Sequence, residues 1–440
     1  MADTHLPPQP PPHLPSVQAP LLSSNHHQQE GNRSTDLDRA LEWLEMFLTF
    51  LGFNQSTALS LCLSWSAFVV VGVVLPVLAL VLSQCSDCEK YQIKDFELEI
   101  VASQACLAAV SLLCLSHNLR KYGIRKFLFV DLHSGHTAGL NHQYIKQIKE
   151  SMRLLMLWLL PCFILKTARE VIRMLYVERE TWLLSIAILF TLVLSWTYVS
   201  TISLIASILF HLVCNLQVIL FEDYAKLLER ESDVLIFVEE HIRLRFHLSK
   251  ISHRFRIYLL LDFLVVTASQ IVTLFQTTEY RGVITFINGG DFAVSSVVQV
   301  VGIILCLHAA TKISHRAQGI ASLGSRWHAL ATCSSSDASQ LRISNSAGNL
   351  EALHNSFYMN YSESDLESVD YVAMPTHTQL ASYLSSYHRR QAFVMYLQNN
   401  PGGITLYGWT IDRGLLNTIF FIELSLVTFV LGKTIVFSST

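Results

Sequence analysis

Long apolar runs alternate with polar segments along this chain, and their lengths predict its architecture. A membrane core about 30 Å thick needs ~20 helical residues to cross it. Seven segments satisfy this requirement, at residues 57–82, 98–118, 152–176, 183–220, 256–277, 291–312 and 411–437. The pattern therefore predicts an all-α, polytopic membrane protein with seven transmembrane helices. The fourth and seventh runs exceed the required length, so we expect both helices to extend into the cytosol.

The polar segments predict the remaining organisation. Residues 1–35 are rich in Pro, His and Gln, as is typical of a disordered tail. Residues 36–56 repeat leucines at helical spacing, which indicates an amphipathic helix at the membrane interface. Spans one to six, with cytosolic helical extensions, occupy 57–331. The Ser- and Asp-rich segment 332–375 is expected to be a disordered cytosolic loop, and 376–440 contain a cytosolic helix and the seventh span.

The distribution of basic residues predicts how the chain is oriented. Cytosolic loops of membrane proteins carry an excess of Lys and Arg. The N-terminal segment and the loops after spans two, four and six together carry 21 of them. The alternate loops carry 4, which are Lys90, Lys94, Arg179 and Arg281. We therefore expect the N-terminus in the cytosol and the C-terminus outside, the reverse of a G-protein-coupled receptor.

Composition and motifs exclude several classes of function. The chain is 51% hydrophobic and only 15% charged, which is unusual for a soluble protein. Its net charge of −3 gives no basic field for nucleic acid. No Walker loop, GxSxG, HExxH or paired CxxC motif is present, so we expect neither an enzyme nor a bound metal or cofactor. Lipid is the one partner that the composition itself predicts, and an integral plasma-membrane location is favoured over an internal membrane.

The third span carries charges that are costly inside a membrane. Lys166, Arg169 and Arg173 share one helix face because they are spaced by three and four residues. Glu170 can pair with Lys166 and Arg173 within the helix, or the three cations can line a ligand pocket open to the outside. In the second case, residues of spans four and six would complete the pocket: Trp196, Tyr198, Asp291, Ser295 and Gln299. Glu423 lies at a depth that suits pairing with Lys166.

Small and polar side chains form a stripe along the seventh span. On a helical projection most of its members fall within an arc of about 100°. Two explanations are open, which are close packing against another helix and a pore-lining face with apolar narrowings that act as a gate. The predicted pore-lining residues are Asn417, Thr418, Phe421, Leu424, Ser425, Thr428 and Gly432.

The sequence Leu406 to Thr434 resembles the last span of the insect gustatory and odorant receptor superfamily. Gly408, Asp412 and Arg413 match its G-x-x-x-(D/E)-R-like start, and Thr428-Phe429 resembles its Thr-Tyr pair. Lys433-Thr434 replaces the Gln-Phe end. The predicted topology over residues 35–440 also resembles the plant gustatory-receptor-like proteins, a membrane family often labelled as a domain of unknown function.

This resemblance implies a homotetrameric, ligand-gated cation channel whose final helices surround the pore. We therefore expect a chemoreceptor-like ion channel subunit that binds a small molecule in an outer pocket. The sequence does not identify that ligand. The departure at Lys433 puts cation selectivity in doubt. A secondary transporter and a non-conducting membrane scaffold remain as alternatives. The chain has no internal repeat, which weighs against an inverted-repeat transporter.

Overall fold

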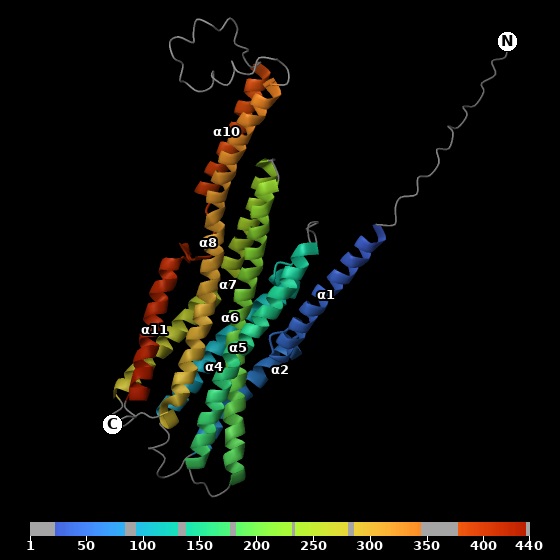
Figure 1. Ribbon diagram of the computed structural model, residues 1–440. Coiled ribbons are helices and arrows are strands. Elements are labelled where there is room, and N and C mark those ends of the chain that lie inside the picture. Colours follow the sequence, from blue (N-terminus) through green and yellow to red (C-terminus); the bar gives the residue numbers. More distant parts are fainter. Residues whose placement is uncertain are drawn as a thin grey trace, which may run out of the picture.

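The computed structural model describes residues 23–83, 94–130, 138–176, 182–230, 234–279, 286–344 and 377–436. These residues form a bundle of long helices and one short hairpin (Figure 1). The helices are α1 (Ser23–Phe50), α2 (Ala58–Val69), α3 (Leu75–Leu82), α4 (Lys94–Phe127), α5 (Ala138–Tyr176), α6 (Trp182–Arg230), α7 (Val234–Glu279), α8 (Phe286–Ser344), α10 (His377–Asn399) and α11 (Arg413–Val436). The predicted all-α class is confirmed.

Five helical segments in the described part are long and apolar enough to cross a membrane. They are Ala58–Leu82, Glu97–Phe127, Trp182–Leu228, Val234–Gln276 and Gly290–Cys333. All five coincide with predicted spans, although α4, α6, α7 and α8 extend well beyond the apolar runs. α5 and α11 occupy the other two predicted positions, at 152–176 and 411–437.

The first span is not one uniform α-helix. The π-helical segment η1 (Val70–Val74) joins α2 to α3, and Pro76 stands at the start of α3. Proline lacks the N–H that an α-helix would use at this position, and a local π-turn is one way for a helix to accommodate such an interruption. The irregularity of this span therefore has a physical cause.

α6 forms the centre of the bundle, with α8 beside it (Figure 1). In the most apolar window of α6, 83% of the residues are buried, against 22% in the first span. Nearly every side chain from Ile202 to Val213 is buried. A helix that is apolar on all faces is stable only where neighbours surround it, which explains why the fourth run is the longest and most uniform in the sequence.

Beyond the apolar runs, α10 packs against the extended ends of α7 and α8. Phe237, Trp327 and Phe393 form an aromatic cluster there, with ring centroids 5.2 to 5.9 Å apart. α8 continues to Ser344, inside the segment 332–375 that we predicted to be disordered. Residues 345–376 and 1–22 lie outside the described residues. α1 begins at Ser23, upstream of the predicted start at 36.

A hairpin connects α10 to α11. Its strands β1 (Thr405–Leu406) and β2 (Trp409–Thr410) pair antiparallel, and Tyr407 and Gly408 both have positive φ between them. This is the two-residue turn that matches strand twist, and glycine favours it. The backbone N–H groups of Ile404 and Thr405 donate to Ser314 and Ser252. The hairpin thereby fixes the start of α11 to α7 and α8.

Candidate functional site

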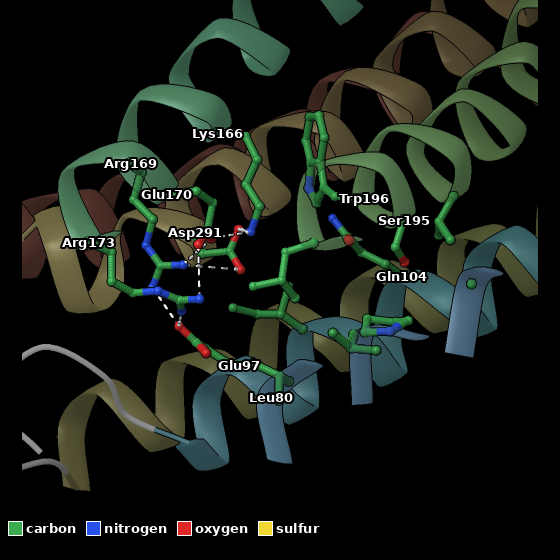
Figure 2. A pocket seen from close by; sticks show the side chains of 16 residues that line it. Leu80, Glu97, Gln104, Lys166, Arg169, Glu170, Arg173, Ser195, Trp196 and Asp291 are labelled. Atoms are coloured by element: carbon green, nitrogen blue, oxygen red, sulfur yellow. Dashed lines mark hydrogen bonds and ion pairs between the residues drawn. The ribbon is translucent and has the colours of Figure 1, made fainter. Parts of the chain in front are cut away.

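A small cavity lies between the first span, α4, α5, α6 and α8, and most of the predicted pocket residues meet there (Figure 2). α5 contributes its charged face, because the three- and four-residue spacing of Lys166, Arg169 and Arg173 points all three side chains the same way. Asp291 enters from α8 and Trp196 from α6. Five of the eight residues predicted to form the ligand pocket therefore line one cavity.

The charged side chains around this cavity form a continuous network. Glu170 accepts from Arg169 at 2.5 Å and lies 3.0 Å from both Lys166 and Arg173. Glu97 on α4 bridges two cations, at 2.6 Å from Arg169 and 2.7 Å from Arg173. The dashed lines in Figure 2 mark these contacts.

Asp291 completes the network by pairing with Lys166. The network contains three cations and three carboxylates, and every side chain in it is at most 8% exposed. Buried charges persist only where partners compensate them, and here the formal charges cancel. The face is therefore not a free cationic wall. Internal pairing with Glu170 accounts for part of the balance, and carboxylates from two other helices supply the rest.

Glu97 was not among the residues predicted for this site. It lies one residue before the predicted second span, at a position expected to face the membrane interface. A signal was nonetheless present, because three cations on one face of span three exceed the single carboxylate of their own helix. Glu170 and Asp291 together leave one positive charge unbalanced, which requires another acidic residue near that depth.

The cavity itself is small. A volume of about 30 Å³ is open to the centre of a water molecule, which suffices for about two waters. Drug-sized ligands occupy pockets of about 300–1,000 Å³. Gln104 lines the cavity, and its Nε2 atom has no hydrogen-bond partner in the described part of the protein. The space as it stands suits water or a single small ion.

The other predicted pocket residues are divided between two places. Trp196 donates from Nε1 to Ser295 at 3.4 Å, and Gln299 accepts from Gln270 at 3.2 Å. Ser295 and Gln299 line a second cavity of about 10 Å³ next to the first. Tyr198 lines neither cavity, because its side chain packs against the main core.

The expected pair between Lys166 and Glu423 is wrong. Lys166 is already paired with Glu170 and Asp291. Glu423 on α11 instead accepts a hydrogen bond of 2.9 Å from Thr267 on α7. Similar depth in the membrane was the only basis for the predicted pair, and depth does not determine which side of a bundle a residue occupies.

The stripe on α11 faces away from the chain's own bundle. α11 lies at the edge of the molecule beside α7 and α8 (Figure 1), and it buries Glu423 and Val427 against them. The predicted pore-lining side chains at Asn417, Thr418, Phe421, Leu424, Ser425 and Thr428 are all exposed, and Gly432 is half-buried. Packing within one chain therefore does not explain the stripe.

The residues that carry the family resemblance have identifiable local roles. Gly408 occupies the positive-φ turn of the hairpin. Asp412 caps α11, because its Oδ1 atom accepts from the N–H of Leu415 at 2.8 Å. Arg413 is the first helical residue, and Phe429 lies exposed next to Thr428. The motif thus specifies how the last helix begins.

Fold and site together define a polytopic helical membrane protein with a charge-compensated interior. The family described as "Protein of unknown function (DUF3537)" matches residues 39–422, and the chain belongs to this family. The fold is similar to that of the insect olfactory receptor OR5 from Machilis hrabei, with 13% sequence identity and a TM-score of 0.45. That similarity covers 90% of this chain and 99% of the receptor. No curated protein matches in sequence.

Proposed function

We propose that the chain is one subunit of a chemoreceptor-like, ligand-gated ion channel whose pore is lined by α11. In this proposal α5 and α11 complete a set of seven spans, with the N-terminus in the cytosol. α11 is 24 residues long. A helix of that length extends about 36 Å, which is sufficient to cross a bilayer. The motif resemblance of residues 406–434 supports a tetramer, with a plasma-membrane location.

The exposed polar stripe of α11 carries the proposal. Thr418 and Ser425 donate to backbone carbonyls of their own helix, at 3.0 and 2.6 Å, so lipid would tolerate both hydroxyls. Asn417 differs, because its carboxamide is exposed and has no hydrogen-bond partner among the described residues. A carboxamide without a partner is costly in hydrocarbon. Water in a pore, or a neighbouring subunit, would remove that cost.

The charge network behind the cavity is proposed as the closed form of the ligand site. A ligand larger than a few atoms can enter only if α4 moves away from α5, since Glu97 holds Arg169 and Arg173 across that boundary. An anionic ligand could replace the Glu97 carboxylate and keep the formal charges balanced. Ligand binding and helix movement would then be coupled through the same cations.

A cysteine scan of α11, combined with bilayer recording of the purified protein, tests the pore. The background replaces Cys62, Cys106 and Cys333, which are exposed, together with Cys85 and Cys88. Cysteines at the stripe positions Asn417, Ser425 and Thr428 are expected to react with charged thiol reagents in open channels and to change the current.

Two control positions distinguish the proposed pore-lining face of α11 from its buried face and from its lipid-facing face. Val427→Cys lies on the buried face, and Ile422→Cys replaces a side chain that is 52% exposed on an apolar face that would contact lipid. Neither is expected to react. Protection of the whole stripe in correctly assembled protein would refute the pore and favour a subunit contact in a non-conducting scaffold. Saturable substrate flux without current would favour a transporter.

A further inference from the structure

Another, larger pocket lies where α4 ends against α7. It offers about 440 Å³ to the centre of a water molecule, against 30 Å³ for the cavity of the charge network by the same measure. Five basic side chains line it, from Lys126, His247, Lys250, His253 and Arg254. No Asp or Glu of the described residues lines this pocket. The two lysines and the arginine concentrate positive charge there, which favours an anionic occupant.

Arg254 is held in place by aromatic rings and a backbone carbonyl of the described residues. Its guanidinium lies over the ring of Tyr122, 3.8 Å from the centroid, and over that of Phe129 at 4.6 Å. Nη1 donates to the backbone carbonyl of Lys126 at 3.0 Å. No carboxylate in the described parts of the chain pairs with Arg254, Lys126 or Lys250. A guanidinium fixed in this way keeps N–H donors available for an incoming anion.

The backbone at the end of α4, which forms one side of the pocket, adopts uncommon conformations. Gly123 has a φ of +69° and interrupts the helix, and Phe129 has a φ of +57°. Residues other than glycine rarely occupy this region, and such strain persists where surrounding contacts enforce it. Here Phe129 is buried, and its ring contacts both Arg254 and His247, the latter with centroids 5.2 Å apart.

The pocket also lies at a suitable depth for a phosphorylated headgroup. Its residues follow the predicted second span, which ends near 118, and precede the fifth, which starts near 256. Both segments belong to the side that the charge distribution assigns to the cytosol. Basic pockets at this level between helices bind phosphoinositide headgroups. Planar guanidinium groups match phosphate oxygens in pairs, and the aromatic rings under Arg254 hold its guanidinium in place for such a contact.

We propose that this pocket binds a polyphosphorylated ring, supplied either by the headgroup of a membrane phosphoinositide or by a free inositol phosphate. The proposal goes beyond channel activity and is independent of it. The proposal uses the predicted orientation in one respect, which is that the pocket faces the cytosol. Phosphoinositide headgroups and free inositol phosphates both occur there. Arg254 would contact a phosphate from a fixed position, and the ammonium groups of Lys126 and Lys250 would contact the remaining phosphates. Lys250 would leave the ring of Phe246 to do so, since its Nζ lies 4.1 Å from that centroid.

Binding is measured by isothermal titration on the full-length protein in nanodiscs of phosphatidylcholine. The probes are inositol hexakisphosphate, a short-chain phosphatidylinositol bisphosphate, and short-chain phosphatidylcholine as the uncharged control. The test variant is Lys126→Gln/Lys250→Gln, in which both lysines are exposed. The matched control is Lys149→Gln/Lys226→Gln, which removes the same charge from exposed positions outside the pocket.

Each basic group near a phosphate contributes about a fivefold factor, so the test variant should bind about 25-fold more weakly. The control variant should bind like the unmodified protein. If the phosphatidylinositol bisphosphate binds and inositol hexakisphosphate does not, the source is a membrane headgroup. If inositol hexakisphosphate binds as tightly as the phosphatidylinositol bisphosphate, the source is a soluble ligand. Absence of binding by both phosphorylated probes, or equal weakening in the two variants, would overturn the proposal.

A measurement without substitutions provides an independent check. Amine acetylation followed by mass spectrometry compares Lys250 with Lys149 in the unmodified protein. The bound probe should slow acetylation of Lys250 and Lys126 at least several-fold and leave Lys149 unchanged. Uniform protection of all three lysines would show non-specific charge screening and would contradict a pocket at this place.

Discussion

Glu97→Gln is the substitution that most directly tests the charge network. Glu97 is the one carboxylate that α4 contributes to the network, and it contacts Arg169 and Arg173 at 2.6 and 2.7 Å. The change leaves three buried cations with two carboxylates. Arginine does not lose its proton in proteins, so the excess charge remains. Removing one partner of a buried pair typically costs ~3–5 kcal/mol.

The expected loss lies at the lower end of this range, at about 3 kcal/mol. Both arginines keep a second contact, because Glu170 lies 2.5 Å from Arg169 and 3.0 Å from Arg173. The double variant Glu97→Gln/Arg173→Gln restores equal numbers of cations and carboxylates. It should therefore be less destabilised than the sum of its two single variants, by about 2 kcal/mol.

The free energy of unfolding is measured in mixed micelles by titration with a denaturing detergent, at equal protein concentration for each variant. Glu150→Gln is the control, since Glu150 lies 3.8 Å from Lys146 and both side chains are largely exposed. Exposed pairs contribute about 0–1 kcal/mol. A loss below about 1 kcal/mol for Glu97→Gln, or an additive double variant, would mean that water in the cavity screens these charges and would refute the reasoning.

Two further predictions concern a second buried carboxylate and the topology. Asp262 on α7 is 4% exposed. Among the described residues its Oδ2 atom has no hydrogen-bond partner, and no cation pairs with the carboxylate. Asp262→Asn should therefore leave the unfolding free energy unchanged or raised in the same titration, and a loss comparable to that of Glu97→Gln would contradict this contrast. For topology, N-glycosidase treatment of protein from a eukaryotic host should leave its gel mobility unchanged. The chain has three N-x-S/T sequons, at Asn32, Asn54 and Asn360. The proposed orientation places all three on the cytosolic side, so a mobility shift traced to any of them would reverse that orientation.

Positions of helices were predictable because the required length of an apolar run is set by the bilayer. The run at 57–82 matches a helical segment that ends at the same residue, Leu82. Helical extensions beyond the membrane were less predictable. α8 continues to Ser344 through a polar region whose composition alone favours disorder. α10 packs against the part of α8 that directly precedes this region, through Trp327 and Phe393, and a helix that is stabilised by packing at one point can propagate beyond it.

Only the part of the candidate site that lies on a single helix, α5, was predictable from the sequence. Helical periodicity placed Lys166, Arg169 and Arg173 on one face and Glu170 within reach, and these contacts exist. The identity of the opposing carboxylates depends on how helices are rotated about their axes, which no local pattern encodes. Glu97 was therefore missed. The size of the cavity depends on the same rotations, so the sequence did not reveal that it holds little more than water.

The charge network and the stripe on α11 differ in how their polar groups are satisfied, and the proposed channel gives them different roles for that reason. In the network every charge is paired within the described part of this chain, by Glu170 on α5 itself and by Glu97 and Asp291 on two other helices. The network therefore needs no second chain to balance its charges. Along α11 the opposite holds for Asn417, whose exposed carboxamide has no partner in the described part of the chain. Its neighbours Thr418 and Ser425 bond only to carbonyls of their own helix. A polar group that the chain leaves unmet at membrane depth requires either a further chain or water, and the proposed pore between identical subunits would supply both.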